Sequence, residues 1–384
     1  MNASYLLTPA IMLMFILICW AFSNLKVLPH LEESTPRYGY IDGLRGIAAV
    51  LVVCAHSWRV NLMGFSNDEI LKADYFYNPN FGAIGVQIFF CITGFLFYEK
   101  ISSNKRQDWY KFFLSRFKRI APLYSLAILL LVTITAYNSK SFGVEMIPGT
   151  VKMMAFGLFG QTYKTASYDG SHLITVLWTL PFEWKFYAIL PLIAALMSTT
   201  RTLLLGWSFT IILLCSLLYA DVFNVWVYFV SGAIAAVVNS KFNNRKHIMA
   251  TIFFLMTTAA IVYSAFIDIP KYGWERFMLS TLFFVSVIMA KPKILSSKPL
   301  VFMGEISYSV YLMHVFLFFL FGAFIKNYVS PGEINNVYFY TLLLSYCVVT
   351  VSICTMTFKY IEYPFIRKKT PIPNDALIEH KKAP

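Results

Sequence analysis

Long apolar runs dominate this sequence of 384 residues and limit the folds that it can adopt. A helix that crosses a bilayer needs roughly 17–25 mostly apolar residues, and about eleven runs come close to that length. They lie at residues 8–25, 41–61, 81–98, 119–137, 173–197, 202–220, 222–239, 247–267, 276–290, 300–325 and 337–361. A shorter run at 150–160 is too brief to cross, and we expect it to be re-entrant or to lie at the interface. The sequence therefore predicts an all-α fold, a polytopic bundle of transmembrane helices.

The composition supports a membrane protein. Only 13% of the residues are charged and 58% are hydrophobic, whereas soluble domains carry roughly 25% charged residues. The net charge of +13 could indicate nucleic acid or an acidic ligand, but basic loops that orient the spans explain it, and we expect no nucleic-acid partner. Six cysteines lie within apolar runs without metal-ligand or CxxC spacing, which predicts small core residues: Cys19, Cys54, Cys91, Cys215, Cys347 and Cys354.

Basic stretches orient the predicted spans. Four of them, at residues 99–119, 241–247, 291–298 and 367–382, would face the cytoplasm. Eleven spans then place the N-terminus outside and the C-terminus inside, in what we expect to be a bacterial inner membrane. The first run lacks a basic n-region and a small-residue cleavage site, so we expect an uncleaved helix rather than a signal peptide. The expected parts are an added helix and linker (1–37), a membrane domain (38–367) and a basic cytoplasmic tail (368–384).

Ionisable residues inside apolar runs are the first candidates for function, because charge at membrane depth is costly. Arg45 and His56 lie eleven residues apart, which on a helix is about 1,100° of rotation and roughly 16 Å of rise, hence one face. A histidine suits a general base that activates a hydroxyl, and an arginine suits an oxyanion or a phosphate. Asp42 could pair with Arg45 on the same face. For an isolated pair, an interfacial anchor and a satisfied core histidine would be the simpler interpretation.

Two arginines precede the run at 119–137. Arg116 and Arg119 are three residues apart and share a helical face, with Lys118 beside them. They are either ordinary positive charge at a membrane boundary or a site for phosphates such as those of coenzyme A. Glu362, near the end of the last run, is expected to pair with a basic residue for structure.

Two more polar groups lie in apolar runs. Glu183 and Tyr187 are four residues apart, and Glu183 either pairs with a basic residue or has a part in the reaction. Ser307, Tyr311 and His314 form a stripe that predicts either hydrogen bonds between helices or substrate binding. No phosphate-binding glycine loop, zinc spacing or GxSxG elbow occurs, so we expect no metal. The glycines of GAIGVQIFFCITGF are expected to allow close helix packing.

Six segments in order resemble the acyltransferase-3 family of integral membrane O-acyltransferases, of the O-antigen and exopolysaccharide O-acetylase type. The segments are YIDGLRGIAAVLVVCAH, GVQIFFCITGFL, RFKRIAPLY, WTLPFEWKFY, GEISYSVYLMH and EYPFIR. The family hallmark Arg/Lys-x10-His is matched by Arg45 and His56. The resemblance implies ten core spans, with the first helix as an addition. The usual acidic position of the second segment is Gln87 here, and the second Glu of the fourth is Trp184.

The resemblance also implies an activity and its parts. The family moves an acyl group, usually acetyl, from acetyl-CoA or another acyl-CoA to a hydroxyl of a carbohydrate or lipid-linked glycan, within membrane lipids. His56 would be the base or transient acyl carrier, supported by Arg45 and Glu183, while Arg116 and Arg119 would bind the coenzyme phosphates. No SGNH-hydrolase-type domain follows the last span, so we expect the membrane domain or a partner to complete the transfer.

Other classes of function stay open at this point. A secondary transporter of a sugar or small anion could use Arg45, His56 and Glu183 as a path, but it predicts inverted repeats and matching broken helices that we do not find. A glycosyltransferase using a lipid-linked sugar would need acids on an external loop, where Asp68, Glu69 and Asp74 form the one cluster. A scaffold would leave the buried charges unexplained.

Overall fold

The computed structural model describes residues 7–33, 38–56, 79–102, 107–140, 143–196, 224–242, 248–328 and 336–366. These residues are almost entirely helical, and the β-type contact among them is an isolated bridge between Lys164 and Asp169. The helices that are long and apolar enough to cross a membrane are Leu7–Asn24, Asn80–Ser102, Trp109–Ser139, Ser307–Ile325 and Val337–Ile366. The chain is thus an all-helical, multi-pass membrane protein. The count of eleven spans is not confirmed and stays a prediction, and the run at 202–220 and the acidic cluster at 68–74 lie outside the described residues.

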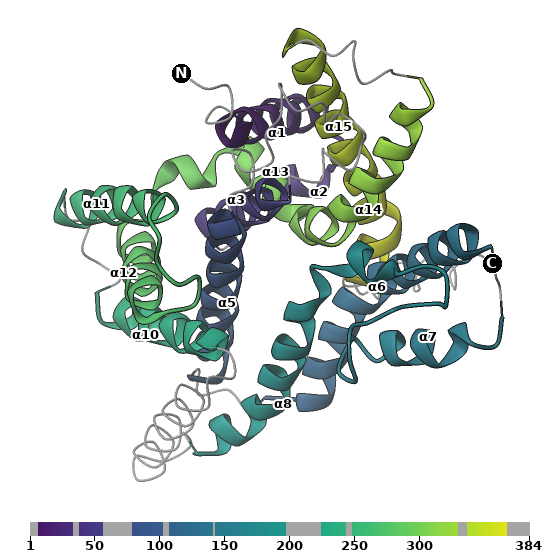
Figure 1. The fold of residues 1–384 in the computed structure, drawn as a ribbon. Coiled ribbons are helices and arrows are strands. Elements are labelled where there is room, and N and C mark those ends of the chain that lie inside the picture. The colour runs from purple at the N-terminus through teal and green to yellow at the C-terminus, as the bar shows by residue number, and fades with distance from the viewer. Residues whose placement is uncertain are drawn as a thin grey trace, which may run out of the picture.

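Two helices at the centre carry most of the packing (Figure 1). They are α3 (Gly39–Ala55) and α5 (Pro79–Ser102), which run side by side. A group of three helices packs on one side of α5: α10 (Val227–Phe242), α11 (Ile248–Ser264) and α12 (Trp274–Ala290). On the other side of α3 lie α1 (Leu7–Asn24), α13 (Lys298–Glu305), α14 (Ser307–Lys326) and α15 (Asn336–Thr357).

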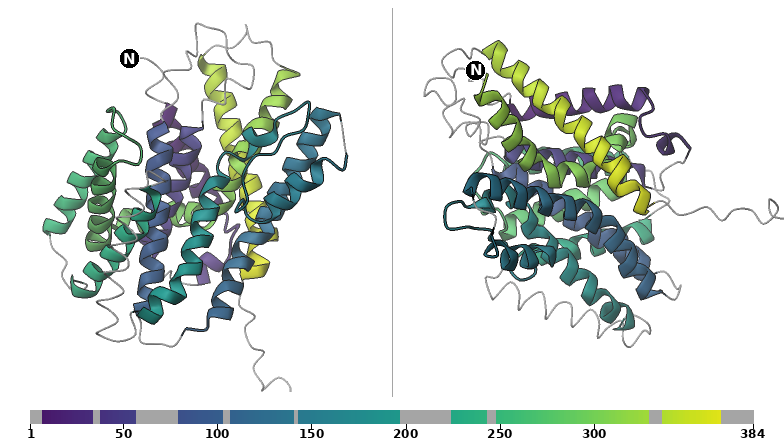
Figure 2. Two further views of the ribbon diagram at one scale, coloured as in Figure 1. Left: turned by 60° about the horizontal axis from the view of Figure 1, so that its bottom comes forward. Right: turned by 90° about the vertical axis from the view of Figure 1, so that its right-hand side faces the viewer.

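A third group of helices lies apart from α3 in the ribbon (Figure 2). Side chains of this group and of α3 line a common pocket. The group contains α6 (Trp109–Ser139), α7 (Met146–Met154) and α8 (Leu180–Leu196). The chain closes with η8 (Phe358–Glu362) and α16 (Tyr363–Ile366), which continue α15 and pack against α6. The short helix α2 (His30–Glu33) follows α1.

The structure corrects three helix boundaries. The run at 173–197 is not one helix, because η3 (Gly170–Ile174) and η4 (Leu177–Thr179) precede α8, and the Val176 carbonyl between them accepts from Tyr311 Oη at 2.8 Å. The run at 300–325 bends at Ile306, where φ is −84° and ψ is 4°. The helix expected to reach residue 61 ends at Ala55, and His56 caps it with its N–H 3.0 Å from Val53 O.

The helix in the segment at 150–160 is too short to cross a bilayer, in agreement with the expectation that this segment does not span. Helix α7 has nine residues, which is about 13.5 Å of rise against a hydrocarbon core of roughly 30 Å. Tyr124 of α6 holds it by donating to Met153 O at 2.6 Å. The predicted role of the cysteines is confirmed for the five in the described residues, all of which are buried: Cys19, Cys54, Cys91, Cys347 and Cys354.

Glycines allow α5 and α10 to touch, as the sequence predicts. A Cβ added at Gly94 would lie 2.1 Å from Phe229 O, and one added at Gly232 would lie 2.1 Å from Cys91 O. Both distances are well inside van der Waals contact. The two helices therefore pack backbone to backbone at this point, in the way that small residues permit between membrane helices.

A Gly94→Val variant is expected to lower stability by about 1–3 kcal/mol or more, because overpacking forces the two backbones apart. The measurement is the thermal unfolding midpoint of the purified protein in detergent. Thr341→Val, on an exposed position of α15, is the matched control and should change the midpoint little. An unchanged midpoint for Gly94→Val would contradict the close crossing.

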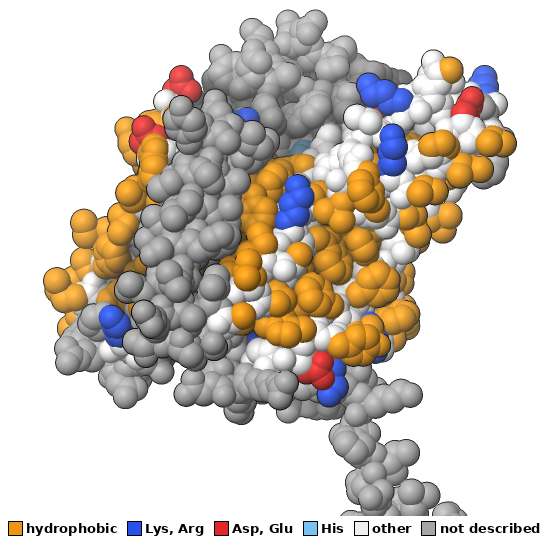
Figure 3. Space-filling view, turned by 90° about the horizontal axis from the view of Figure 1, so that it is seen from below, with side chains coloured by type: hydrophobic (Ala, Val, Ile, Leu, Met, Phe, Trp, Pro, Cys, Tyr) orange, Lys and Arg blue, Asp and Glu red, His pale blue; other side chains and the backbone are white. Residues whose placement is uncertain are grey.

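The outer surface suits a lipid environment (Figure 3). Exposed hydrophobic side chains form a broad band there, with most charged side chains towards its edges. Large exposed apolar side chains on separate helices include Leu13, Leu129, Leu255 and Leu344. In water such a band would be a liability, whereas lipid tails are as apolar as leucine.

Candidate functional site

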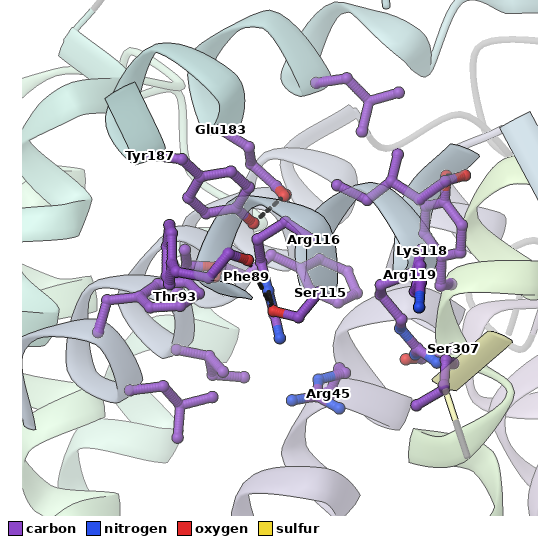
Figure 4. Close-up of a pocket in the computed structure, with 18 of the residues that line it drawn as sticks. Arg45, Phe89, Thr93, Ser115, Arg116, Lys118, Arg119, Glu183, Tyr187 and Ser307 are labelled. Atoms are coloured by element: carbon purple, nitrogen blue, oxygen red, sulfur yellow. Dashed lines mark hydrogen bonds between the residues drawn. The ribbon is translucent and has the colours of Figure 1, made fainter. Parts of the chain in front are cut away.

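A cavity of about 1170 Å³ lies between α3, α5, α6, α8 and α14. It is larger than the range of about 300–1,000 Å³ usual for small-molecule sites. Six basic and three acidic side chains line it: Arg45, Lys100, Lys111, Arg116, Lys118, Arg119, Asp108, Glu183 and Glu305. Figure 4 shows Arg45, Arg116 and Arg119 converging from two helices on one space. The excess of cations favours an anionic ligand.

The fold brings together most of the residues that the sequence predicts for a site. The lining contains Arg45, Arg116, Lys118, Arg119, Glu183, Tyr187, Ser307 and Tyr311. Asp42, His56 and His314 are not among its described lining residues. Ser307 begins α14 fully buried, with no hydrogen-bond partner for its hydroxyl among the described residues.

Close backbone contact sets the position of Arg45. A Cβ added at Gly304 of α13 would lie 1.9 Å from Asp42 O, so α13 can approach α3 only with glycine at this place. The predicted pairing of Asp42 with Arg45 is confirmed, with 3.3 Å between Arg45 Nη1 and Asp42 Oδ1. The packing and the ion pair hold the guanidinium of Arg45 at the cavity wall.

The two arginines of α6 differ in their partners. Arg119 Nη1 lies 3.3 Å from Oε2 of Glu362, whose side chain is fully buried. The predicted pairing of Glu362 with a basic residue is therefore confirmed. Arg116 instead donates to Ser115 Oγ at 3.4 Å and stacks over Phe97 at 5.4 Å, and no ion pair of the described residues includes it. Arg116 is the guanidinium left for a ligand.

An Arg116→Gln variant is expected to raise the KM for an anionic donor by about 10- to 100-fold, because a hydrogen bond to a charged group contributes about 1.5–3 kcal/mol. Steady-state rates at varied donor concentration in membrane vesicles would measure this. Lys152→Gln removes the same charge from exposed α7, outside the cavity lining, and serves as the control. A donor KM unchanged in Arg116→Gln would contradict this assignment.

Glu183 and Tyr187 of α8 line the cavity on the side that faces Arg116. Tyr187 Oη donates to Glu183 Oε2 at 2.9 Å, and Figure 4 shows both side chains facing Arg116. Phe97 packs edge-on against the Tyr187 ring at 5.2 Å. Glu183 belongs to the cavity lining, and no ion pair of the described residues includes it. Its carboxyl group is therefore available to interact with a ligand.

A residue from outside the six family-like segments contacts a lining residue of the cavity. His30 Nε2 of α2 lies 3.3 Å from Oε1 of Glu305, and its ring stacks on Tyr363 at 4.4 Å. Burial raises the pKa of Glu305, but the hydrogen bond from His30 and the charge of Arg119 outweigh it, so the pKa is below its ordinary value. The contact with His30 therefore holds the Glu305 carboxyl group at the cavity wall.

Tyr311 closes the inner end of the cavity. Its hydroxyl donates to Val176 O at 2.8 Å and accepts from Thr179 Oγ1 at 2.9 Å. Phe89 packs against its ring at 5.6 Å. These contacts join α14, α5 and the η3–η4 segment, and they place the next turn of α14 just beyond the cavity.

That next turn carries His314, which meets His56. His314 Nε2 lies 3.3 Å from His56 Nδ1, between residues 258 positions apart. Sequence reasoning named both histidines but did not pair them. The sequence shows that each histidine ends a family-like segment on a different apolar run, which marks both as candidates. It does not show that they meet, because that depends on the packing of α14 against α3.

Two departures from the family pattern have structural explanations. Gln87 is fully buried, and its amide donates to Lys271 O at 2.7 Å and accepts from Ser280 Oγ at 2.6 Å. Both ends of the amide thus link α5 to α12 and the segment before it. Trp184 packs against Phe156 at 4.9 Å and contacts Tyr187. Among the described residues, no three His, Cys, Asp or Glu side chains are grouped as metal ligands.

Comparison with known proteins tests the resemblance found in the sequence. A family model described as an acyltransferase domain covers residues 38–358. The chain belongs to this acyltransferase-3 family. The resemblance found in the sequence is thereby confirmed, and the acyltransferase domain includes every residue named above for the cavity except those of α2 and the last helical turns.

Curated relatives of this acyltransferase-3 chain are acetyltransferases by name, and several of them are O-acetyltransferases. O-acetyltransferase OatA of Staphylococcus aureus strain NCTC 8325 is 25% identical over 387 residues, covering 90% of this chain and 60% of its own length. ORF330 of Acidianus two-tailed virus, whose name gives acetyltransferase as a provisional activity, is 26% identical over 322 residues, 76% of this chain and 88% of its own. The chain spans about 60% of the OatA relatives. No solved structure matches the chain.

Proposed function

We propose that this protein is an acyl-CoA-dependent O-acyltransferase that acetylates hydroxyl groups of a cell-envelope carbohydrate. The observation that carries the proposal is the cavity, because cationic side chains line it and Tyr311, at its inner end, is one turn before the buried His314 and its contact with His56. Membership of the acyltransferase-3 family and the names of the curated relatives support the reaction type.

The cavity suits a long anionic donor. Arg116, Lys118 and Arg119 would bind the phosphates of coenzyme A, since guanidinium groups bind phosphate oxygens in pairs. Arg116 would carry most of this binding, because Arg119 already neutralises Glu362. The pantetheine arm would run past Phe89 and Thr93 to Tyr311. Movement of Tyr311 would let the thioester reach His56.

The acyl transfer needs one general base, His56, to carry the proton from the acceptor to the leaving group. His56 Nε2 takes the proton of the acceptor hydroxyl while its oxygen attacks the thioester carbonyl carbon. The carbonyl oxygen becomes an oxyanion, for which a backbone N–H near His56 would be the stabilising group. The C–S bond then breaks, and the thiolate of coenzyme A takes the proton from His56. The products are an O-acyl ester and the free thiol, and His56 returns to its neutral form.

The basic end of the cavity would face the cytoplasm, where acyl-CoA occurs. That orientation follows from the basic loops, and it puts the N-terminus outside a bacterial inner membrane, with 1–37 as an added helix and linker. The acceptor, a polysaccharide or a lipid-linked glycan, would reach His56 from the opposite face.

The decisive test compares cells with and without the gene. Envelope polysaccharide is purified from both and its ester content is measured by mass spectrometry before and after mild alkali. The proposal predicts an alkali-labile mass of acetyl units that the deletion removes and the wild-type gene restores. Identical ester content in both strains would overturn the proposal, and transport of a small anion without donor consumption would then be the better account.

A further inference from the structure

The contact between His56 and His314 is held from several sides. His314 is fully buried, and Tyr346 of α15 donates to its carbonyl oxygen at 3.2 Å. The two imidazole centroids lie 5.1 Å apart with their planes inclined by 59°. His56 lies at the end of α3, where Val52 O is 2.8 Å from its Nδ1. Three helices therefore define how these rings meet.

Neighbouring carbonyls assign the protons on both rings. His314 Nδ1 lies 3.0 Å from Val310 O and 2.9 Å from Tyr311 O. Because a carbonyl oxygen only accepts, Nδ1 of His314 carries the proton and its Nε2 is the acceptor. The same rule places a proton on Nδ1 of His56, beside Val52 O. The inter-ring contact is then a hydrogen bond from His56 Nδ1–H, shared between Val52 O and His314 Nε2.

We propose that His314 is a positioning residue of the acyl transfer, whose Nε2 accepts from Nδ1–H of His56 and so keeps Nε2 of His56 as the basic nitrogen. This inference rests on the proposed function. When His56 Nε2 takes the proton of the acceptor hydroxyl, the ring becomes an imidazolium. Its hydrogen bond to His314 is then charge-assisted, which makes it roughly twice as strong. The carbonyl end of α3 also favours a cation at this place.

A neutral histidine suits this position better than a carboxylate would. In Ser–His–Asp triads a buried Asp orients the histidine and stabilises its charged form. Burying a carboxylate between membrane helices would require a permanent counter-charge. His314 needs none, and a second proton on its Nε2 would point at the N–H of His56. The ring therefore stays neutral and remains an acceptor throughout the reaction.

Two amide variants separate this role from a structural one. His314→Gln brings an amide oxygen to the place of Nε2 and keeps the acceptor for His56. His314→Asn brings an amide N–H to the place of Nδ1 and keeps the bond to Val310 O, but it loses the acceptor. The assay is transfer of radiolabelled acetyl from acetyl-CoA to envelope polysaccharide in membrane vesicles. We expect kcat of the Asn variant to fall about 10- to 100-fold, as for a lost hydrogen bond to a charged group, with donor KM unchanged and the Gln variant retaining most activity.

The outcomes are distinguishable. A low kcat in the Asn variant alone, with the thermal unfolding midpoints of both variants alike, supports the proposal. Equal activities of His314→Gln and His314→Asn, whether both are active or both inactive, overturn the proposal. A purely structural role would not depend on whether the hydrogen-bond acceptor for His56 is kept. An active His56→Ala variant overturns the proposed function itself. An inactive His56→Ala together with a fully active His314→Asn overturns only the role of His314.

Discussion

A His56→Ala variant is expected to bind the donor normally and to lose between about 10²- and 10⁴-fold in acyl-transfer rate, the usual contribution of a general base. The reason is geometric: His56 is not among the described lining residues of the cavity, so its removal does not touch the phosphate-binding end. Donor binding to purified protein in detergent and ester formation in vesicles are measured separately. The expected result is an unchanged donor affinity with a rate near background.

A matched histidine checks that the loss is specific. His172 of η3 interacts with Tyr168 Oη at 3.2 Å and is not among the described lining residues of the cavity, so His172→Ala should keep its activity. If His56→Ala forms esters at more than a tenth of the wild-type rate, His56 is not the base. If it binds no donor, the defect lies in folding, and the thermal unfolding midpoint would show it.

The class of fold and most of the cavity residues were predictable because their signals are local. Apolar runs indicate helices, and spacings of three or four residues indicate a shared face. Asp42 therefore pairs with Arg45 as expected, and Glu183 contacts Tyr187, four residues away. Hydropathy does not report a bend inside an apolar run. The break at Ile306 arises where Gly304 lets α13 press against α3, so it was not predictable from apolar content.

The partners across helices were not predictable from one sequence. His56 meets His314, His30 meets Glu305, and these pairs are 258 and 275 positions apart. A charged or polar residue in an apolar run must find a partner or a role, but its identity depends on how distant helices pack. The partners of the two arginines of α6 were also not predictable. Both carry the same charge on one helical face, so there was no reason in the sequence to expect different partners for Arg116 and Arg119. Only Arg119 lies beside the fully buried Glu362, at the π-helical turn that continues α15.

That difference predicts the largest loss of stability in the site. Arg119→Met would leave the fully buried carboxylate of Glu362 without its cation, and breaking a buried pair on one side costs about 3–5 kcal/mol. Ser309, which accepts a hydrogen bond from Thr357, would remain as a neutral donor to that carboxylate. We expect Arg119→Met to unfold at a clearly lower temperature in detergent, and Arg119→Met combined with Glu362→Gln to recover most of the loss, because the uncharged pair needs no charge balance. The double variant would still bind donor more weakly than wild type, since Arg119 lines the cavity. Recovery of stability without recovery of donor affinity would separate the two roles of Arg119, whereas a double variant as unstable as Arg119→Met alone would show that the ion pair does not explain the loss.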